Sequence, residues 1–361
     1  MKKQPEGCFF VWQGRQESNP QPMVLETTTL PVELLPYASH MNHYIHICPA
    51  RQGCWVTGGK KMEDRYLVIY AGGTIGMAGK VLAAHDSAAI EAAVKELPKH
   101  ADLIRLPEVY DSSALDAERI RALMDTLEMY HKDYQGFLIL FGTDTMAYLH
   151  SILKWSISAL HKPIAITGSV KFPEEDPTEG QENIRQSLAF LRKKRGHGEV
   201  AIVMGGRALI NGSMKFDTGA SLPYLESKES VLEALRQARE REGHWQNPVF
   251  RKVRDMQIEV LYCQPFMKLS QEPIGDGLIL CVYGQGTLPP LKALRTRAEA
   301  YCNSGRPVII LSQCPRNQLD MRRYAGGSLL DGLDIPAYSG SFLEEGLAYM
   351  LSQTGFQELI D

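Results

Sequence analysis

Four turns of the chain carry hydroxyl, carboxylate or ammonium side chains directly after apolar segments, and such side chains can do catalytic chemistry at a sheet edge. The first turn has the sequence Tyr70-Ala71-Gly72-Gly73-Thr74-Ile75-Gly76-Met77. Its paired glycines permit a tight turn and a close backbone approach, and they place the hydroxyl of Thr74 at the end of a strand. The turn does not match the dinucleotide-binding motif Gly-x-Gly-x-x-Gly, because Ala71 occupies the position of the first glycine. A turn without chemistry remains an alternative.

The second and third turns also present oxygen-bearing side chains. Asp111-Ser112-Ser113 suits a carboxylate ligand, although the same residues are ordinary turn and capping residues. Thr143-Asp144-Thr145 follows Gly142 at the end of a strongly apolar segment. A helix that begins at Met146 needs only one of these three side chains as its cap. The presence of all three makes a functional site as well supported as helix capping.

The fourth turn contains Lys215, after the segment Arg207–Met214. An ordinary surface lysine is one interpretation of this residue. A lysine packed beside a carboxylate and a threonine could instead act as a base, because burial readily lowers the pKa of its ammonium group.

The elements that must position these turns alternate between short apolar runs and amphipathic segments. We predict strands at 66–70, 103–106, 136–141, 163–167, 199–204, 258–263, 277–283 and 307–311. We predict helices at 87–97, 116–131, 146–160, 181–194, 291–303 and 343–352. This alternation is typical of parallel sheets covered on both faces, in which ligands bind in the turns beyond the carboxyl ends of the strands.

The predicted organisation is two doubly wound α/β domains, a larger N-terminal one at 62–235 and a smaller C-terminal one at 254–361, joined by a linker at 236–253. Residues 1–61 lack a helical or alternating apolar pattern and are rich in Pro, Gln, Asn and Thr, so we expect an unstructured extension. A sharper hypothesis is that this stretch is spurious and that translation starts at Met62.

Composition narrows the class of function. A length of 361 residues suggests about two domains, and a net charge of -3 gives no reason to expect nucleic acid or an acidic membrane surface as a partner. No apolar run approaches the roughly 18 residues of a membrane span. The seven cysteines are an odd number without regular spacing, which indicates a reducing, cytoplasmic compartment. No His-x-x-x-His or Cys-x-x-Cys pair suggests a metal, so we expect no metal and no cofactor.

Taken together and in this order, the four turns resemble the bacterial-type L-asparaginase family, most closely its cytosolic type I members. The two family signatures correspond here to Gly72-Gly73-Thr74-Ile75-Gly76 and Gly142-Thr143-Asp144-Thr145-Met146, and Asp111-Ser112-Ser113 lies between them. The segments 166–169, 180–183 and 311–314 also resemble family segments. The likeness extends from about Tyr66 to about Ser352.

The resemblance implies a role for each matching residue. Thr74 would be the nucleophile that attacks the side-chain amide of L-asparagine, and Thr143, Asp144 and Lys215 would support it. Ser112 and Ser113 would bind the substrate α-carboxylate, and Asp144 its α-ammonium group. The family releases aspartate and ammonia through an acyl-threonine intermediate, uses no cofactor, and forms homodimers or homotetramers in which a neighbouring subunit completes each site.

Departures from the family pattern leave alternatives open. The segment Met77–His85, which matches the family's lid, contains no tyrosine, and Tyr110 is a candidate replacement. L-Glutamine is an alternative substrate, and the ammonia-generating subunit of a tRNA-dependent amidotransferase is an alternative role. A catalytically silent ligand-binding protein of the same fold is a further possibility. A nucleotide-binding oxidoreductase would have only the fold class in its favour.

Overall fold

The computed structural model describes residues 65–352, apart from 79–82, 85–96, 98–99, 174, 215–223, 226–229, 244, 270–271 and 316. The predicted extension at 1–61, the helix predicted at 87–97 (except Leu97) and Lys215 therefore lie outside the described residues.

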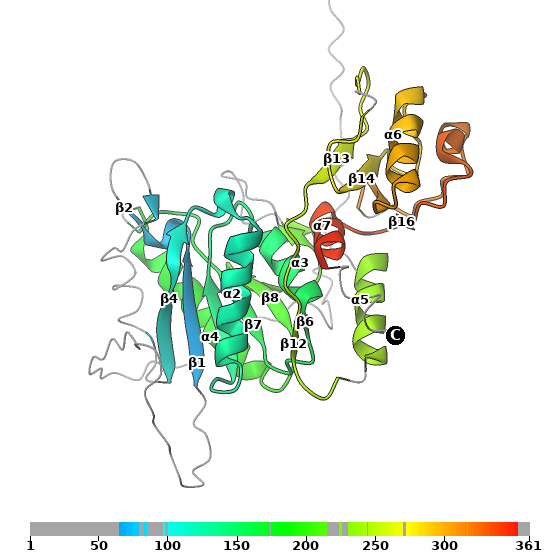
Figure 1. Cartoon of the computed structure of the whole chain (residues 1–361). Coiled ribbons are helices and arrows are strands. Elements are labelled where there is room, and N and C mark those ends of the chain that lie inside the picture. The colour runs from blue at the N-terminus through cyan, green and yellow to red at the C-terminus, as the bar shows by residue number, and fades with distance from the viewer. Residues whose placement is uncertain are drawn as a thin grey trace, which may run out of the picture.

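A six-stranded sheet forms the larger part of the fold (Figure 1), with the order β4-β1-β5-β7-β8-β9. Its strands are β1 (Tyr66–Gly72), β4 (Ala101–Tyr110), β5 (Gly136–Leu140), β7 (Ile164–Thr167), β8 (Val200–Met204) and β9 (Arg207–Leu209). Neighbouring strands are parallel except β8 and β9. Because parallel strands have their carboxyl ends at one edge, the turns after β1, β4 and β5 meet there.

Helices cover both faces of this sheet. On one face, α2 (Ala117–Tyr130) and α3 (Met146–Ser156) bury Leu123 and Leu149 against Ile69. On the other face, α4 (Pro177–Lys193) buries Leu188 against Val68. The alternation of Val68 and Ile69 between the two faces is the two-residue period of a strand, and burial on both faces explains why these strands are apolar throughout.

A second sheet has the order β13-β14-β15-β16 and is wholly parallel. Its strands are β13 (Ile258–Tyr262), β14 (Gly277–Val282), β15 (Val308–Ser312) and β16 (Ala337–Tyr338). Helix α6 (Lys292–Asn303) covers one face, and α7 (Leu343–Ser352) covers the other. The α/β fold class with two doubly covered sheets is confirmed.

Helix α7 also packs along α3 of the larger sheet, and Figure 1 shows it between the two sheets. One apolar cluster therefore runs from Leu149 of α3 through Met350 of α7 to Ile309 of β15. This core is continuous across the two predicted domains, so it does not mark where one domain ends and the other begins. The domain boundaries therefore stay a prediction.

Helix α5 and several short elements complete the described fold. They are η1 (Thr74–Gly76), β2 (Met77–Ala78), β3 (Ala83–Ala84), η2 (Ser112–Ala114), β6 (Ile157–Ser158), β10 (Ser213–Met214), β11 (Tyr224–Leu225), α5 (Val231–Glu242), β12 (Val249–Phe250) and η3 (Ala325–Leu330).

The structure moves two predicted helix boundaries by four residues each. Helix α3 ends at Ser156 rather than at residue 160, because Ile157 and Ser158 pair with β12. Helix α4 begins at Pro177 rather than at residue 181, because Asp176 caps it by accepting a hydrogen bond from the backbone N–H of Thr178. The predicted linker at 236–253 contains the second half of α5 and all of β12, and its role as a linker stays a prediction.

Candidate active site

The sheet order places three of the four predicted turns side by side. Strand β1 pairs with β4 on one side and with β5 on the other. Thr74 follows β1 in η1, Ser112 follows β4 in η2, and Thr143 follows β5. Sequence order alone does not give this arrangement, because the central strand is the first one in the chain.

Two glycines let the three turns touch. A Cβ atom on Gly73 would lie 2.5 Å from the backbone nitrogen of Gly142, and a Cβ atom on Gly142 would lie 2.7 Å from the Cβ of Ser112. Both distances are far below van der Waals contact, so only glycine permits this packing. Gly73 also has φ 94° and ψ 172°, a conformation that essentially only glycine adopts. The turn that carries Thr74 is thus in backbone contact with the turn that carries Thr143, and Gly142 of the latter lies against the side chain of Ser112.

The Asp-Ser-Ser turn is locked by local hydrogen bonds. The backbone N–H of Ser113 donates to Asp111 Oδ1 at 2.8 Å, and the hydroxyl of Thr145 donates to the carbonyl oxygen of Ser112 at 2.7 Å. Ser112 is only 3% exposed and lies against Gly142, whereas Ser113 is exposed. The geometry therefore brings Ser112, more than Ser113, to the centre of the three turns.

The hydroxyl of Thr145 bears on the two interpretations of the third turn. Thr145 is the N-cap residue of α3, yet its side chain makes no capping hydrogen bond and binds the neighbouring turn instead. Thr143 is buried and Asp144 is exposed. Helix capping thus does not account for the oxygen-bearing residues here, which favours the alternative of a site.

Residues behind the first turn hold the rim of the site in place. The side-chain amide of Asn183 on α4 donates to the carbonyl oxygen of Gly168 at 2.9 Å, and its oxygen accepts from the backbone N–H of Gly205 at 3.1 Å. The hydroxyl of Thr167 donates to Val203 O at 2.5 Å. These contacts do not follow from any sequence motif, and a polar residue at a buried helix position, such as Asn183, is the signal that could have found them.

Tyr110 lies in the core and not in a loop. Its ring packs edge-on against Phe141, with centroids 6.0 Å apart, and the guanidinium of Arg119 lies 5.0 Å from its centroid. Burial raises the pKa of the Tyr110 hydroxyl, with the charge of Arg119 opposing the effect. A phenol with a raised pKa is a weak candidate for taking a proton from Thr74 at neutral pH.

Lys215 lies outside the described residues, so its distance from Thr74 stays open. Met214, the residue before it, pairs with Tyr224 in the two-stranded sheet of β10 and β11. Within the described ranges, no group of His, Cys, Asp and Glu side chains is arranged to hold a metal ion. No helix in the part of the chain that the structure describes is long and apolar enough to cross a membrane.

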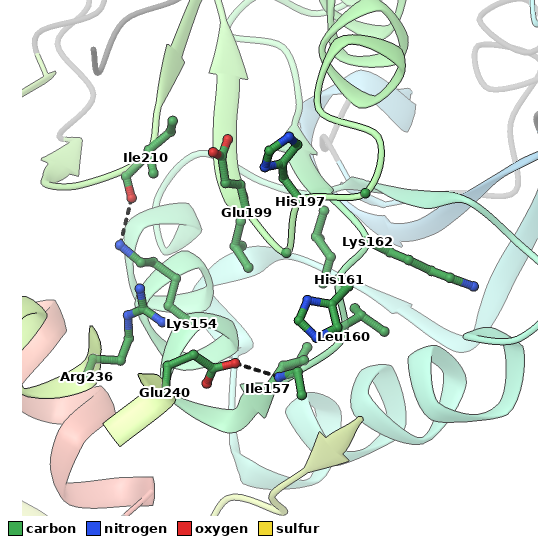
Figure 2. A pocket seen from close by; sticks show the side chains of 15 residues that line it. Lys154, Ile157, Leu160, His161, Lys162, His197, Glu199, Ile210, Arg236 and Glu240 are labelled. Carbon is green, nitrogen blue, oxygen red and sulfur yellow. Dashed lines mark hydrogen bonds between the residues drawn. The ribbon is translucent and has the colours of Figure 1, made fainter. Parts of the chain in front are cut away.

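A cavity of about 340 Å³ lies at the opposite edge of the larger sheet, by the amino ends of β7 and β8 (Figure 2). Ile164 and Val200, at the amino ends of these strands, line it together with Lys154 at the C-terminal end of α3. Thr74 and Thr143 follow the carboxyl ends of β1 and β5, so this cavity is separate from those two residues.

The chain is similar to proteins of known family. The family described as "Asparaginase, N-terminal" matches residues 65–222. L-Asparaginase 1 of Escherichia coli is 28% identical over 261 residues, which cover 67% of this chain and 76% of that protein. The 60 kDa lysophospholipase of Mus musculus is 29% identical over 342 residues, which cover 81% of this chain and 59% of that protein.

Among solved structures, L-asparaginase I from Vibrio cholerae is similar with a TM-score of 0.64 and 22% sequence identity. The match covers 81% of this chain and 94% of that one. At this identity the likeness shows a shared fold.

Proposed function

This chain belongs to the L-asparaginase family, and from that premise we propose that it is an amide hydrolase that converts L-asparagine and water to L-aspartate and ammonia. The observation that carries the proposal is the close packing of the three turns that bear Thr74, Ser112 and Thr143, in which Gly73 lies against the backbone of Gly142 and Gly142 lies against the side chain of Ser112. A turn that served only to connect elements would need neither the Gly73–Gly142 contact nor the Gly142–Ser112 contact.

The proposed reaction begins with attack of the Thr74 hydroxyl on the side-chain amide carbon of asparagine. The new C–O bond forms as the hydroxyl proton passes to the supporting group, for which Lys215 and Thr143 are the proposed residues. The C–N bond then breaks, and the nitrogen leaves as ammonia after receiving that proton. Water attacks the resulting aspartyl ester, which frees aspartate and restores Thr74.

Backbone N–H groups support the charge that develops in this reaction. The backbone N–H groups of the turn at Gly72–Thr74 are the proposed donors, because donors that are already oriented stabilise a tetrahedral oxyanion without reorganisation. Ser112 is proposed to bind the α-carboxylate, with Ser113 at the rim, and the exposed carboxylate of Asp144 to bind the α-ammonium group. A hydrolase of this kind needs no cofactor.

The test is ammonia release from L-asparagine and L-glutamine, measured side by side with the full chain and its Thr74→Ala variant. The proposal expects release from asparagine that Thr74→Ala abolishes. Ammonia release from glutamine alone would mean that the substrate is longer than asparagine by one methylene group, a difference worth about 1–3 kcal/mol in a pocket. Release of a fatty acid from lysophosphatidylcholine, with no ammonia from either amide, would refute the proposal. It would favour a lysophospholipase activity, which is the activity named for the mouse relative.

We also propose a cytoplasmic homo-oligomer, a homodimer or homotetramer, on the basis of the family resemblance. The described cysteines, Cys263, Cys281, Cys302 and Cys314, are all free thiols, which suits a reducing compartment. Light scattering on the purified chain measures the oligomeric state, and a monomer at assay concentrations would contradict this part.

A further inference from the structure

The peptide group that precedes Thr143 is held between two neighbouring turns. Strand β5 lies between β1 and β7 in the larger sheet, so the turns after β1 and β7 flank the turn after β5. On the β1 side, a Cβ atom on Gly73 would lie 2.5 Å from the backbone nitrogen of Gly142. On the β7 side, a Cβ atom on Gly168 would overlap the carbonyl oxygen of Phe141. The Phe141–Gly142 peptide group is therefore packed between two glycines.

The ladders of the sheet do not determine where Gly168 lies. The β5–β7 ladder ends at the pair of Leu140 and Thr167, and the β7–β8 ladder ends at the pair of Ile166 and Ile202. Gly168 comes after the last paired residue of β7 in both ladders. Its position against the Phe141 carbonyl therefore depends on contacts from outside the sheet.

Helix α4 supplies such a contact through Asn183. This side chain is only 3% exposed. Its amide N–H donates to the carbonyl oxygen of Gly168 at 2.9 Å, and its oxygen accepts from the backbone N–H of Gly205 at 3.1 Å. One buried side chain thus ties the turn after β7 to the turn after β8. An apolar residue at this position would leave both backbone groups without that partner.

The same face of α4 also touches the turn of Thr74. Gly180 lies three residues before Asn183, so the two positions share a helix face. A Cβ atom on Gly180 would lie 2.9 Å from Cγ1 of Ile75, which is buried and directly follows Thr74. Helix α4 therefore contacts the first turn through Ile75, and it contacts the turn after β7 through Asn183.

Glu179 holds the far end of the turn after β7. Its carboxylate accepts from the backbone N–H of Val170 at 3.0 Å and from that of Lys171 at 2.8 Å. Neither of these bonds involves Asn183, so both are available in a variant of that residue. A change at Asn183 should consequently release the Gly168 end of the turn and leave the other end anchored.

We propose that Asn183 is a positioning residue for the amide hydrolysis: by holding Gly168 against the Phe141–Gly142 peptide group, it fixes Thr143 relative to the turn of Thr74. This inference rests on the proposed function. Asn183 acts through Gly168 and is not proposed to touch the substrate. Loss of its hydrogen bond would let the peptide group before Thr143 move away from the first turn.

The experiment compares Asn183→Ala with Gln186→Ala in the full chain. Gln186 is the matched control because it is a second buried amide on α4, and its oxygen accepts from the backbone N–H of Gly206 at 2.8 Å, in the β8–β9 turn that Asn183 also binds. This bond does not involve the turn after β7. Gly168→Ala is a second variant, which leaves α4 unchanged and displaces the Phe141 carbonyl directly.

The expected result is a kcat at least tenfold lower for Asn183→Ala with KM within about threefold of wild type, since a misplacement of about 1 Å can cost about 100-fold in rate. KM should change less than kcat because Ser112 keeps its hydrogen bond from the Thr145 hydroxyl. Gly168→Ala should lower kcat in the same direction, and Gln186→Ala should leave kcat unchanged.

Amide hydrogen exchange locates the change. The N–H of Phe141 donates to the carbonyl oxygen of Thr167 at 2.8 Å, at the point where the two turns meet. Exchange of the peptide that contains Phe141 should become faster in Asn183→Ala and stay at the wild-type rate in Gln186→Ala.

Unchanged exchange at Phe141 in Asn183→Ala would overturn the proposal, whatever the activity. Faster exchange with a wild-type kcat, or an equal loss of kcat in Gln186→Ala, would overturn it as well. If Asn183→Ala does not fold, a wild-type kcat in Gly168→Ala overturns the proposal, and a lowered kcat with a wild-type KM supports it. A wild-type chain that hydrolyses neither amide would instead refute the proposed function, and with it a role for Asn183 in catalysis.

Discussion

Replacing Gly73 by alanine tests the contact on which the site depends. The new Cβ would lie 2.5 Å from the nitrogen of Gly142 and 2.7 Å from its Cα, both of them backbone atoms that cannot rotate away. Relieving such an overlap costs about 1–3 kcal/mol. The backbone conformation, with φ 94° and ψ 172°, costs a non-glycine residue about 1–3 kcal/mol more. The sum is a loss of about 2–6 kcal/mol in the free energy of unfolding.

Gly196→Ala is the matched control for backbone strain. Gly196 also has a positive φ, 82°, but a Cβ atom there would meet nothing within 4 Å. We therefore expect this variant to lose only about 1–2 kcal/mol and to keep full activity. The difference between the two variants isolates the contact between the turns.

The assay is urea unfolding followed by fluorescence, together with ammonia release from L-asparagine below the transition. Gly73→Ala should unfold at a lower urea concentration than Gly196→Ala and should have a kcat/KM at least tenfold lower than wild type. Equal losses of stability in the two variants, with activity retained in both, would refute the reasoning that the first and third turns pack through Gly73.

Two further predictions concern buried charges. Burial raises the pKa of Glu345 on α7 to about 7, above the 4.5 of an exposed glutamate, so the native state loses stability as pH rises from about 4.5 through 7. Glu345→Gln removes this loss. Thermal unfolding should show that the variant is more stable than wild type at pH 8, by at most about 3 kcal/mol, and equally stable near pH 4.5. A variant that is less stable than wild type at pH 8 would contradict this prediction. Arg297→Met should cost about 3–5 kcal/mol because it leaves Glu259, now 2.7 Å from Arg297 Nη1, buried without its ion-pair partner. Lys252→Met, which breaks an exposed ion pair, should cost less than about 1 kcal/mol in the same urea titration, and equal costs would contradict the burial argument.

The longer strands of the two main sheets and most helices followed from local sequence because their causes are local, whereas the short strands, β9 and β16 among them, were not predicted. An apolar run such as 136–140 has few alternatives to a buried strand, and Asp116 caps α2 within the same stretch of chain. Helix α5 was overlooked because its sequence is mostly polar. Its signal was present nonetheless: Ser230 accepts a hydrogen bond from the backbone N–H of Glu233, the spacing of a capping box.

Boundaries and contacts that depend on distant residues could not be predicted in this way. Helix α3 ends early because Phe250, far along the chain, pairs with Ile157. The glycines of the first turn predicted a close approach, but only the sheet order identifies Gly142 as the group approached by Gly73. The roles of Thr74 and Lys215 came from the family resemblance, and they stay predictions.

The central claim is that Thr74 is the nucleophile, and the most direct test is to locate the covalent intermediate. The full chain is mixed with L-asparagine, quenched in acid within one turnover, digested and mapped by mass spectrometry. The account predicts an aspartyl ester on the peptide that contains Thr74 and no ester in the Thr74→Ala variant. An ester mapped to Thr143 or to any other residue would contradict it.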